Sequence, residues 1–337
     1  MSPSDRLSRP LHDLRISVTD RCNFRCPYCM PAEIFGEKYE FMPRDEILTF
    51  EEIERVVRAT TRLGVTKVRI TGGEPLLRRK IGRLIQSISS LSEVEDLTLT
   101  TNGVLLADTA KDLRSAGLDR VTVSLDSLEP EVFRTLAGRD VSPDVVLEAI
   151  SAAERAGLTP IKINTVIKRG DNDGEIVPLA RQFHGTDHIL RFIEYMDVGT
   201  RNGWQLDHVV PADEIVSRVH DALPVEPVEP NYPGEVARRY RYVDGGGEIG
   251  VITSVTQPFC GGCTRARLST DGKLVTCLFA SDGVDLRSML RGNASDEEIS
   301  QRIQNVWLER DDRYSETRTE ATTPDAFRRI EMYQIGG

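Results

Sequence analysis

Short apolar runs alternate with amphipathic stretches through the first 195 residues, and this alternation limits the possible folds more than any other feature. Between the runs, apolar residues recur with a helical period, as at Ile53, Val56 and Val57. Glycines at 64, 117 and 157 are suitable helix stops. The strand-like runs are 14–18, 68–71, 97–101, 121–125, 161–167 and 189–195.

This pattern predicts an α/β fold with a parallel sheet wrapped by helices. Six units predict an incomplete (β/α)6 TIM-type barrel, open on one side, with its chemistry at the carboxyl ends of the strands. After residue 195 the alternation stops. We expect a loop at 224–233, β-type runs at 239–243 and 249–255, a hairpin turning at Asp271-Gly272, and charged helices at 296–310 and 325–332. The predicted division is a partial barrel, 1–200, and a β-rich and helical extension, 201–337, that closes the open side.

Three cysteines follow the first run with the spacing Cys22-x3-Cys26-x2-Cys29. Thiolates at this spacing can hold one face of an iron–sulfur cube, and a [4Fe–4S] cluster with three protein ligands leaves one iron open for a substrate or cofactor. The spacing alone fits a zinc knuckle about equally well. After the second run, Gly72-Gly73-Glu74-Pro75 offers a backbone that a ligand can approach closely.

A second cysteine set lies far downstream, as Cys260-x2-Cys263-x13-Cys277. It could be three quarters of a zinc ribbon, but no histidine lies nearby in the sequence to complete it. A second iron–sulfur cluster with an open iron fits better. Arg265 and Arg267, two residues apart, would share one face of a strand and place two cations beside that cluster.

Composition narrows the remaining choices. The net charge of −10 argues against general nucleic-acid binding, so an anionic substrate needs a local basic pocket. Lys162, between apolar Ile161 and Ile163, should point into the barrel, where a triphosphate would balance its charge. The six cysteines are all used by the two sets, which leaves none for disulfides. With no apolar leader and no long apolar run, we expect a cytoplasmic protein without a membrane segment.

Four segments together resemble the GTP 3′,8-cyclase (MoaA) family of radical S-adenosylmethionine (SAM) enzymes, which act in molybdenum-cofactor biosynthesis. They are LRISVTDRCN at 14–23, RITGGEPL at 69–76, PFCGGCTRARL at 258–268 and the terminal Gly336-Gly337. The resemblance extends over essentially the whole chain. It implies two [4Fe–4S] clusters, SAM as cofactor and GTP as substrate.

The resemblance also implies roles for individual residues. The first cluster would be held by Cys22, Cys26 and Cys29, and the second by Cys260, Cys263 and Cys277. The SAM site would comprise Tyr28, Gly72, Gly73, Glu74, Ser124 and Met196. The GTP site would comprise Arg15, Arg69, Thr100, Lys162, Arg191, Arg265 and Arg267. Catalytic roles would fall to Arg265, Arg267, Gly336 and Gly337, since a Gly-Gly end is narrow enough to thread into the barrel, where its carboxylate could meet Arg15 or Arg69.

By the same resemblance, a 5′-deoxyadenosyl radical abstracts the ribose C3′ hydrogen of GTP. The C3′ radical then attacks guanine C8, and the product is (8S)-3′,8-cyclo-7,8-dihydroguanosine 5′-triphosphate. The implied partners are a flavodoxin- or ferredoxin-type electron donor, the downstream cyclic pyranopterin monophosphate synthase and a second copy in a homodimer. Two alternatives stay open: a radical SAM peptide maturase with an auxiliary cluster, and a zinc-dependent binding protein that is not an enzyme.

Overall fold

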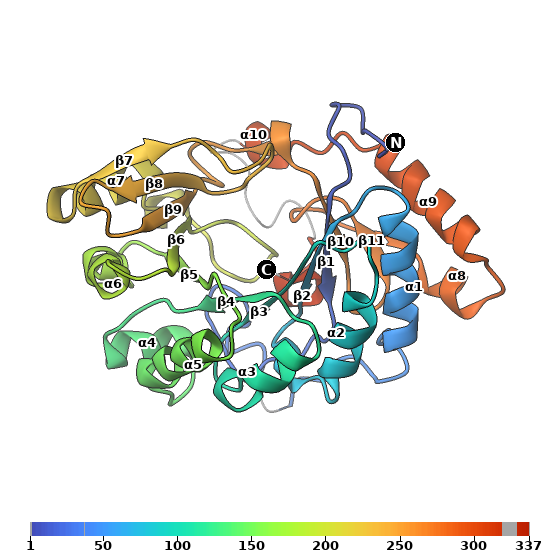
Figure 1. The fold of residues 1–337 in the computed structure, drawn as a ribbon, viewed down its shortest axis with the longest axis horizontal. Helices are drawn as coiled ribbons and strands as arrows, with labels where there is room; N and C mark the ends of the chain where they lie inside the picture. Colours follow the sequence, from blue (N-terminus) through green and yellow to red (C-terminus); the bar gives the residue numbers. More distant parts are fainter. Residues whose placement is uncertain (1, 37, 319–328, 337) are drawn as a thin grey trace.

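One curved sheet of twelve strands forms the centre of this computed structural model, which describes residues 2–36, 38–318 and 329–336 (Figure 1). The strand order is β12-β11-β10-β1-β2-β3-β4-β5-β6-β9-β8-β7. The strands are β1 (Asp13–Ser17), β2 (Lys67–Thr71), β3 (Asp96–Thr101), β4 (Arg120–Ser124), β5 (Lys162–Ile167), β6 (Ile189–Glu194), β7 (Val225–Val228), β8 (Arg238–Tyr242), β9 (Glu248–Ile252), β10 (Arg265–Leu268), β11 (Lys273–Val275) and β12 (Val284–Asp285).

Helices cover the outside of the sheet (Figure 1). The α-helices are α1 (Phe50–Thr61), α2 (Ile81–Ser89), α3 (Leu106–Ser115), α4 (Pro130–Ala137), α5 (Pro143–Arg155), α6 (Ile176–Phe183), α7 (Ala212–Ala222), α8 (Arg287–Arg291), α9 (Asp296–Leu308), α10 (Tyr314–Thr317) and α11 (Met332–Ile335). Short 3₁₀ turns are η1 (Pro75–Leu77), η2 (Asp173–Glu175), η3 (Leu206–His208) and η4 (Cys260–Gly262). Among the described residues, none of these helices combines the length and the apolar character that a membrane crossing requires.

The six expected strands are β1 to β6, and they lie side by side in chain order, all parallel. The sheet begins at β12 and ends at β7 without closing, so the incomplete barrel predicted from the βα alternation is confirmed. The capping box of α1 illustrates the local signals, because Thr49 accepts from the amide of Glu52 while the Glu52 side chain accepts from the amide of Thr49.

The later strands lengthen this sheet at both edges. On one side β9 pairs in parallel with β6, and on the other β10 pairs in parallel with β1. The hairpin expected at Asp271-Gly272 joins β10 to β11, and Gly272 has the positive φ of 84° that such a turn requires. The loop expected at 224–233 was wrong in part: β7 occupies its first half as an edge strand, where Pro227 is tolerated because it needs to donate no ladder hydrogen bond.

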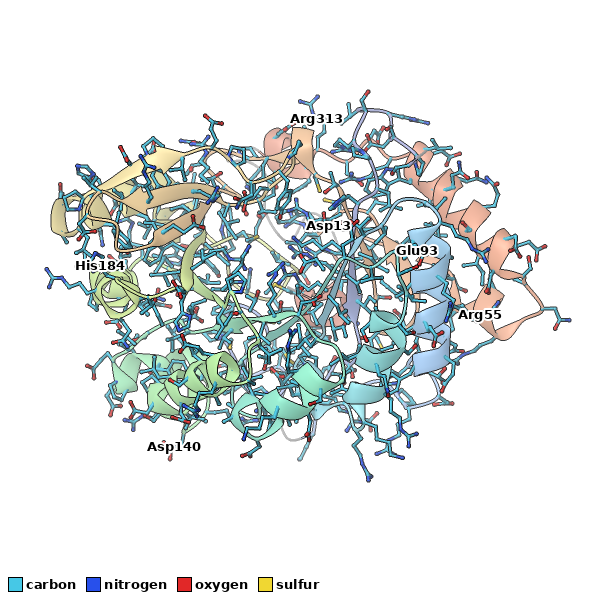
Figure 2. All side chains as sticks on the ribbon, viewed as in Figure 1. Asp13, Arg55, Glu93, Asp140, His184 and Arg313 are labelled. Carbon is cyan, nitrogen blue, oxygen red and sulfur yellow. The ribbon has the colours of Figure 1, made fainter. Side chains whose placement is uncertain are left out.

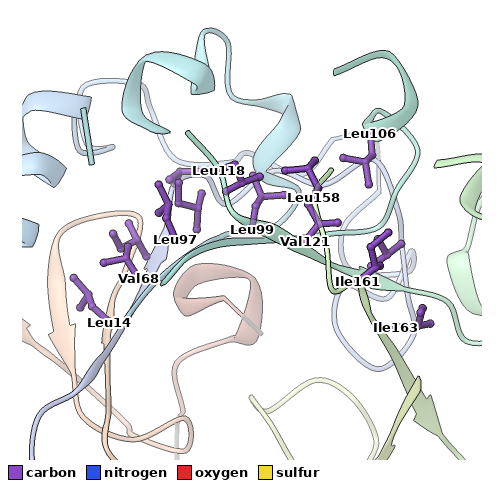
Figure 3. Packing of buried hydrophobic residues seen from close by; sticks show 14 of the residues in the cluster. Leu14, Val68, Leu97, Leu99, Leu106, Leu118, Val121, Leu158, Ile161 and Ile163 are labelled. Carbon is purple, nitrogen blue, oxygen red and sulfur yellow. The ribbon is translucent and has the colours of Figure 1, made fainter. Parts of the chain in front are cut away.

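Alternation along each strand separates an apolar outer face from a polar inner face. Leu14, Val68, Leu99, Val121 and Ile163 are each fully buried on the side that packs against the helices (Figure 3). The residues between them point inward, and many of these are charged. The core therefore lies between sheet and helices, while the concave side of the sheet is left for chemistry.

The last part of the chain packs on the outside of the sheet and also reaches the centre of the molecule. Helix α9 packs on α1, and its own capping box joins Ser295 and Glu298. Helix α11 contacts β1, so the C-terminal segment reaches the middle of the barrel beside β1 and β2 (Figure 1). The helix expected at 325–332 lies largely outside the described residues, and α11 starts only where that expectation ends.

Candidate active site

The concave side of the sheet encloses a large cavity. It is lined by inward-pointing side chains of β1 to β6 and by the loops that carry the second cysteine set, and Asp13, labelled in Figure 2, is one of its lining residues. Of the predicted GTP, SAM and cluster residues, those lining the cavity are Arg15, Tyr28, Arg69, Thr100, Ser124, Lys162, Arg191, Met196, Cys260, Cys263, Arg265, Arg267 and Cys277. The structure thus brings residues from both halves of the chain to one space.

Three arginines lie side by side across neighbouring strands. In register, Arg267 on β10 is opposite Arg15 on β1, which in turn is opposite Arg69 on β2. Burial and the charges of neighbouring guanidinium groups lower the pKa of Arg15 and of Arg69 to about 9. Arg69 donates to the hydroxyls of Thr100 and Thr122, both at 3.0 Å. Such a row is electrostatically costly unless an anion joins it.

The opposite wall adds further positive charge. Burial, followed by the charges of Arg191 and Arg120, lowers the pKa of Lys162 to about 7. Burial and Arg120 lower the pKa of Arg191 to about 10, and Arg191 Nε is buried without a hydrogen-bond partner in the part of the chain that the structure describes. Asn164, in register with Arg191, likewise has a buried Oδ1 that accepts no bond from any described residue. The Arg191 Nε donor and the Asn164 Oδ1 acceptor could therefore form hydrogen bonds with a polar ligand.

The first cysteine triad occupies the loop that follows β1. Arg25 fixes the shape of this loop by donating to the carbonyls of Cys22 (2.8 Å), Phe24 (2.7 Å) and Phe35 (2.6 Å). Burial raises the pKa of Cys26 and of Cys29, and the charge of the Cys22 sulfur raises both further. The Cys22 sulfur accepts from the amide of Phe24 at 3.4 Å and from Asn102 Nδ2 at 3.8 Å.

The Gly72-Gly73-Glu74 loop packs directly against this segment. An added Cβ on Gly73 would lie 2.3 Å from the carbonyl oxygen of Arg21, so only glycine fits there. The Gly73 amide donates to the Thr19 carbonyl at 2.7 Å. The buried Glu74 carboxylate accepts from Leu76 N (3.0 Å), Thr101 Oγ1 (2.9 Å) and Asn102 N (2.8 Å). Because both its oxygens are engaged by protein donors, Glu74 holds the loop in shape.

Tyr28, the aromatic residue of the first triad, is fixed by a residue that the sequence analysis missed. Its hydroxyl donates to Asp126, and the other carboxylate oxygen of Asp126 accepts from Val166 N at 2.8 Å. Burial raises the pKa of Asp126 to about 6. The signal available in the sequence was the position of Asp126 just after a strand, two residues beyond Ser124.

The second triad lies at the other end of the same strands. Cys263 precedes β10, while the first triad follows β1, and these strands run parallel. The expectation that all chemistry falls at carboxyl ends of strands was therefore wrong for this set. Burial raises the pKa of the Cys263 thiol, but the guanidinium groups of Arg265 and Arg310 outweigh it and lower that pKa to about 6. Burial raises the pKa of Cys277 to about 11, and the charge of Cys263 contributes to this rise.

The C-terminal segment ends against β2 and β10. Arg267 donates to the carbonyl of Gly336 and, at 3.4 Å, to that of Ile335. An added Cβ on Gly336 would lie 2.1 Å from Thr71 Cγ2. Gly337 lies outside the described residues, so the expected contact of its carboxylate with Arg15 or Arg69 stays a prediction.

The residues present fit an iron–sulfur cluster at each triad. All six cysteines are free and half-buried, and thiolates are the usual ligands of such clusters. In the second triad a cationic donor, Arg310, contacts the Cys263 sulfur. Within the described residues, no group of three or more His, Cys, Asp or Glu side chains converges on a position for a single metal ion.

Comparison with known proteins agrees with this geometry. Residues 16–183 match the family described as the Radical SAM superfamily, and residues 188–316 match the one described as Molybdenum Cofactor Synthesis C. The GTP 3′,8-cyclase of Acidothermus cellulolyticus is 53% identical, with 99% of this chain and 98% of the relative covered. The GTP 3′,8-cyclase of Staphylococcus carnosus is 48% identical, with the same 99% and 98% coverage.

A solved structure shares the fold at low sequence identity. Streptococcus suis SuiB bound to S-adenosylmethionine superposes with a TM-score of 0.62 and 17% identity over 90% of this chain. This chain spans 66% of the length of SuiB. At this identity the likeness concerns the fold alone.

Proposed function

Because this chain belongs to the GTP 3′,8-cyclase family of radical SAM enzymes, we propose the following roles for its residues. The chain is an enzyme of molybdenum-cofactor biosynthesis that converts GTP to (8S)-3′,8-cyclo-7,8-dihydroguanosine 5′-triphosphate. Family membership sets aside the peptide-maturase and zinc-protein alternatives.

The first triad, Cys22, Cys26 and Cys29, holds the [4Fe–4S] cluster that binds SAM. When bound, the cluster and SAM supply a 5′-deoxyadenosyl radical that abstracts the C3′ hydrogen of GTP. Tyr28, held by Asp126, and the close-packed backbone of Gly72 and Gly73 shape the SAM pocket, which Ser124 and Met196 complete. Glu74 contributes by holding the glycine loop against Thr101 and Asn102.

The observation that carries the GTP assignment is the row of Arg267, Arg15 and Arg69 on the inner face of the sheet. Burial and repulsion by neighbouring arginines lower the pKa of Arg15 and of Arg69. A polyanion bound in the cavity would be attracted by all these positive charges together. Lys162 and Arg191 extend the same positive region along the opposite wall, and Thr100 orients Arg69. Together these residues hold GTP and fix its ribose for hydrogen abstraction.

The second triad, Cys260, Cys263 and Cys277, would hold a second [4Fe–4S] cluster, which would bind GTP through its purine. Arg265 lines the cavity next to it, with its guanidinium 5.0 Å from the centre of the Phe259 ring. After cyclisation the product radical takes up one electron and one proton, and this cluster is suited to provide the electron. Arg265 and Arg267 act there by positioning the substrate, because guanidinium groups are weak acids.

The C-terminal glycines take part in catalysis from inside the barrel. Gly336 lies between Thr71 and Arg267, where a larger residue has no room. In this role Gly336 and Gly337 position a group for hydrogen abstraction once SAM has been cleaved. Arg267 then serves both the tail and the substrate.

Anaerobic incubation of the reconstituted protein with GTP, SAM and dithionite tests the assignment. We expect an isomer of GTP and 5′-deoxyadenosine, both detected by mass spectrometry. The matched variants Arg15→Ala and Arg69→Ala should retain iron and SAM cleavage while losing the isomer. Full yield of the isomer in both variants would contradict the GTP site.

The remaining assignments concern organisation and partners. Residues 1–200 form the radical SAM part and 201–337 the part that carries the second triad and extends the sheet at both edges. Each turnover consumes two electrons, one to cleave SAM and one to reduce the product radical, so a flavodoxin- or ferredoxin-type donor is required. The product passes to cyclic pyranopterin monophosphate synthase. Free thiols suit a reducing cytoplasm. A homodimer is the proposed assembly, to be measured by light scattering.

A further inference from the structure

A buried ionic network lies behind the second cysteine triad. Arg9 Nε donates to Asp5 Oδ2 at 2.6 Å, and Arg310 Nη1 donates to the same oxygen at 3.2 Å. Arg310 Nε reaches Asp312 at 3.2 Å. The side chains of Arg310, Arg9 and Asp5 are exposed by only 1%, 2% and 0%. The network therefore joins the N-terminal segment to the segment after α9 in the interior of the protein.

This network also holds the cysteine loop. Arg9 Nη1 donates to the carbonyl of Cys260 at 2.8 Å, and Arg310 Nη1 donates to the carbonyl of Cys263 at 2.7 Å. Arg310 Nη2 lies 3.2 Å from the Cys263 sulfur and donates to it. The guanidinium group of Arg310 thus donates hydrogen bonds to both the backbone and the sulfur of Cys263. It also lies over the Trp307 ring, with Cζ 4.5 Å from the ring centre.

The first triad has different surroundings. Its Cys22 sulfur accepts only from neutral donors among the described residues, the amide of Phe24 and the side-chain amide of Asn102. The charges of Asp126 and Glu331 act on Cys26 and Cys29 respectively. The nearby cation Arg25 donates to backbone carbonyls and, among the described residues, to no sulfur. At the second triad, by contrast, Arg9 Nη2 is a buried donor without a partner in the described part of the chain, and Arg9 lines the cavity there.

Hydrogen bonds to the sulfurs of an iron–sulfur cluster and nearby positive charge both stabilise its reduced, more negative form. The asymmetry between the triads therefore implies different reduction potentials. Arg310 contributes to the difference because it is buried, cationic and donates a hydrogen bond to a ligand sulfur, while Arg265 adds a second cation beside Cys263.

We propose that Arg310 is a positioning residue of the second cluster, which fixes Cys263 and raises the reduction potential of that cluster above that of the first. Asp5 and Arg9 keep Arg310 in place, so the N-terminal segment takes part in tuning a cluster whose cysteines lie about 250 residues further along the chain. The inference rests on the second cluster proposed above.

The test uses full-length protein in which Cys22, Cys26 and Cys29 are replaced by alanine, so that only the second cluster contributes a signal. After anaerobic reconstitution, iron is counted and the midpoint potential is measured by a redox titration followed by electron paramagnetic resonance. We expect Arg310→Met to lower the midpoint. Arg310→Lys should lower it by less, because an ammonium keeps the charge but cannot reach all the contacts of the guanidinium.

Arg6→Met is the matched control, because it removes an equal charge at a side chain that is 61% exposed, in the N-terminal segment that contacts Arg310. It should leave the midpoint unchanged. Unchanged midpoints in both Arg310 variants would overturn the proposal, as would a loss of iron with no shift in the cluster that remains, since that result marks a purely structural residue. If circular dichroism shows that Arg310→Met does not fold, the midpoint potential of Arg310→Lys alone tests the proposal, and an unchanged midpoint in that variant would overturn it. Absence of any cluster in the parent triple variant would instead refute the second cluster itself.

Discussion

Replacing Gly336 with alanine tests whether the tail must occupy the centre of the barrel. Gly336 has a φ of 72° and a ψ of 141°, a combination that costs a residue with a side chain about 1–3 kcal/mol. The new Cβ would also lie 2.1 Å from Thr71 Cγ2, and overpacking of this kind costs about 1–3 kcal/mol. The sum of about 2–6 kcal/mol lowers the docked population of the tail by a factor of about 30 or more, because 1.4 kcal/mol is tenfold.

The assay separates docking of the tail from folding of the protein. In anaerobic reactions, Gly336→Ala should make the cyclised GTP isomer at least about 30-fold more slowly, given the lower end of that penalty. Iron content and 5′-deoxyadenosine formed without GTP should match the unchanged protein, because the tail contributes no strand to the sheet and none of the described cysteines.

Two further variants decide whether the steric argument is correct. Gly245→Ala is the matched control, since Gly245 has a φ of 83° but nothing within 4 Å of the added Cβ, and we expect normal cyclisation. Adding Thr71→Ser to Gly336→Ala removes the closest methyl group and should restore part of the rate, leaving the loss due to backbone strain. Cyclisation by Gly336→Ala at the unchanged rate would refute the docked tail.

Further predictions concern the triads and the basic residues. Cys26→Ala should abolish SAM cleavage, and 5′-deoxyadenosine formed by this variant would contradict the first cluster. Cys263→Ala should halve the iron content while the protein still binds SAM, and an unchanged iron content would contradict the second cluster. Arg267→Ala should cost about 2–5 kcal/mol in GTP turnover, measured as kcat/KM, and spare SAM cleavage without GTP. The pKa of Lys162 is about 7 in the free protein, and bound phosphates raise it. Above pH 7, GTP binding should therefore be coupled to the uptake of a proton and should weaken as the pH rises. Calorimetry in two buffers of different ionisation enthalpy should detect this proton uptake, and Lys162→Gln should abolish it.

The βα alternation was sufficient to predict the first six strands to within a residue or two, because each strand carries its own apolar face. It was not sufficient for β7, because its sequence Val-Glu-Pro-Val, between Pro224 and Glu229, is typical of a loop. It also did not predict the places of β9 and β10 in the sheet. Those strands are set by pairing with β6 and β1, which are distant in sequence.

Site residues that belong to a local sequence motif could be predicted from the sequence. Site residues that act through buried contacts with distant parts of the chain could not. Both cysteine triads and Lys162 follow from spacing and alternation, and the structure places Lys162 in the cavity as expected. Asp126 and Arg310 belong to no motif; their roles come from contacts with Tyr28 and Cys263 that only the folded chain creates. Long-range ionic contacts of this kind leave no periodic signal in a single sequence.

The parallel pairing of β1 with β10 explains why this enzyme needs one continuous sheet. The first triad follows the carboxyl end of β1 and the second precedes the amino end of β10, so the two lie at opposite ends of neighbouring strands. The five residues of β1, at about 3.3 Å each, set these ends roughly 17 Å apart. A substrate that reaches both must lie along the strands, over the side chains of Arg15, Arg69 and Arg267. A nucleoside triphosphate has the length and the charge for this path, and its purine, ribose and phosphates can then meet different parts of one wall.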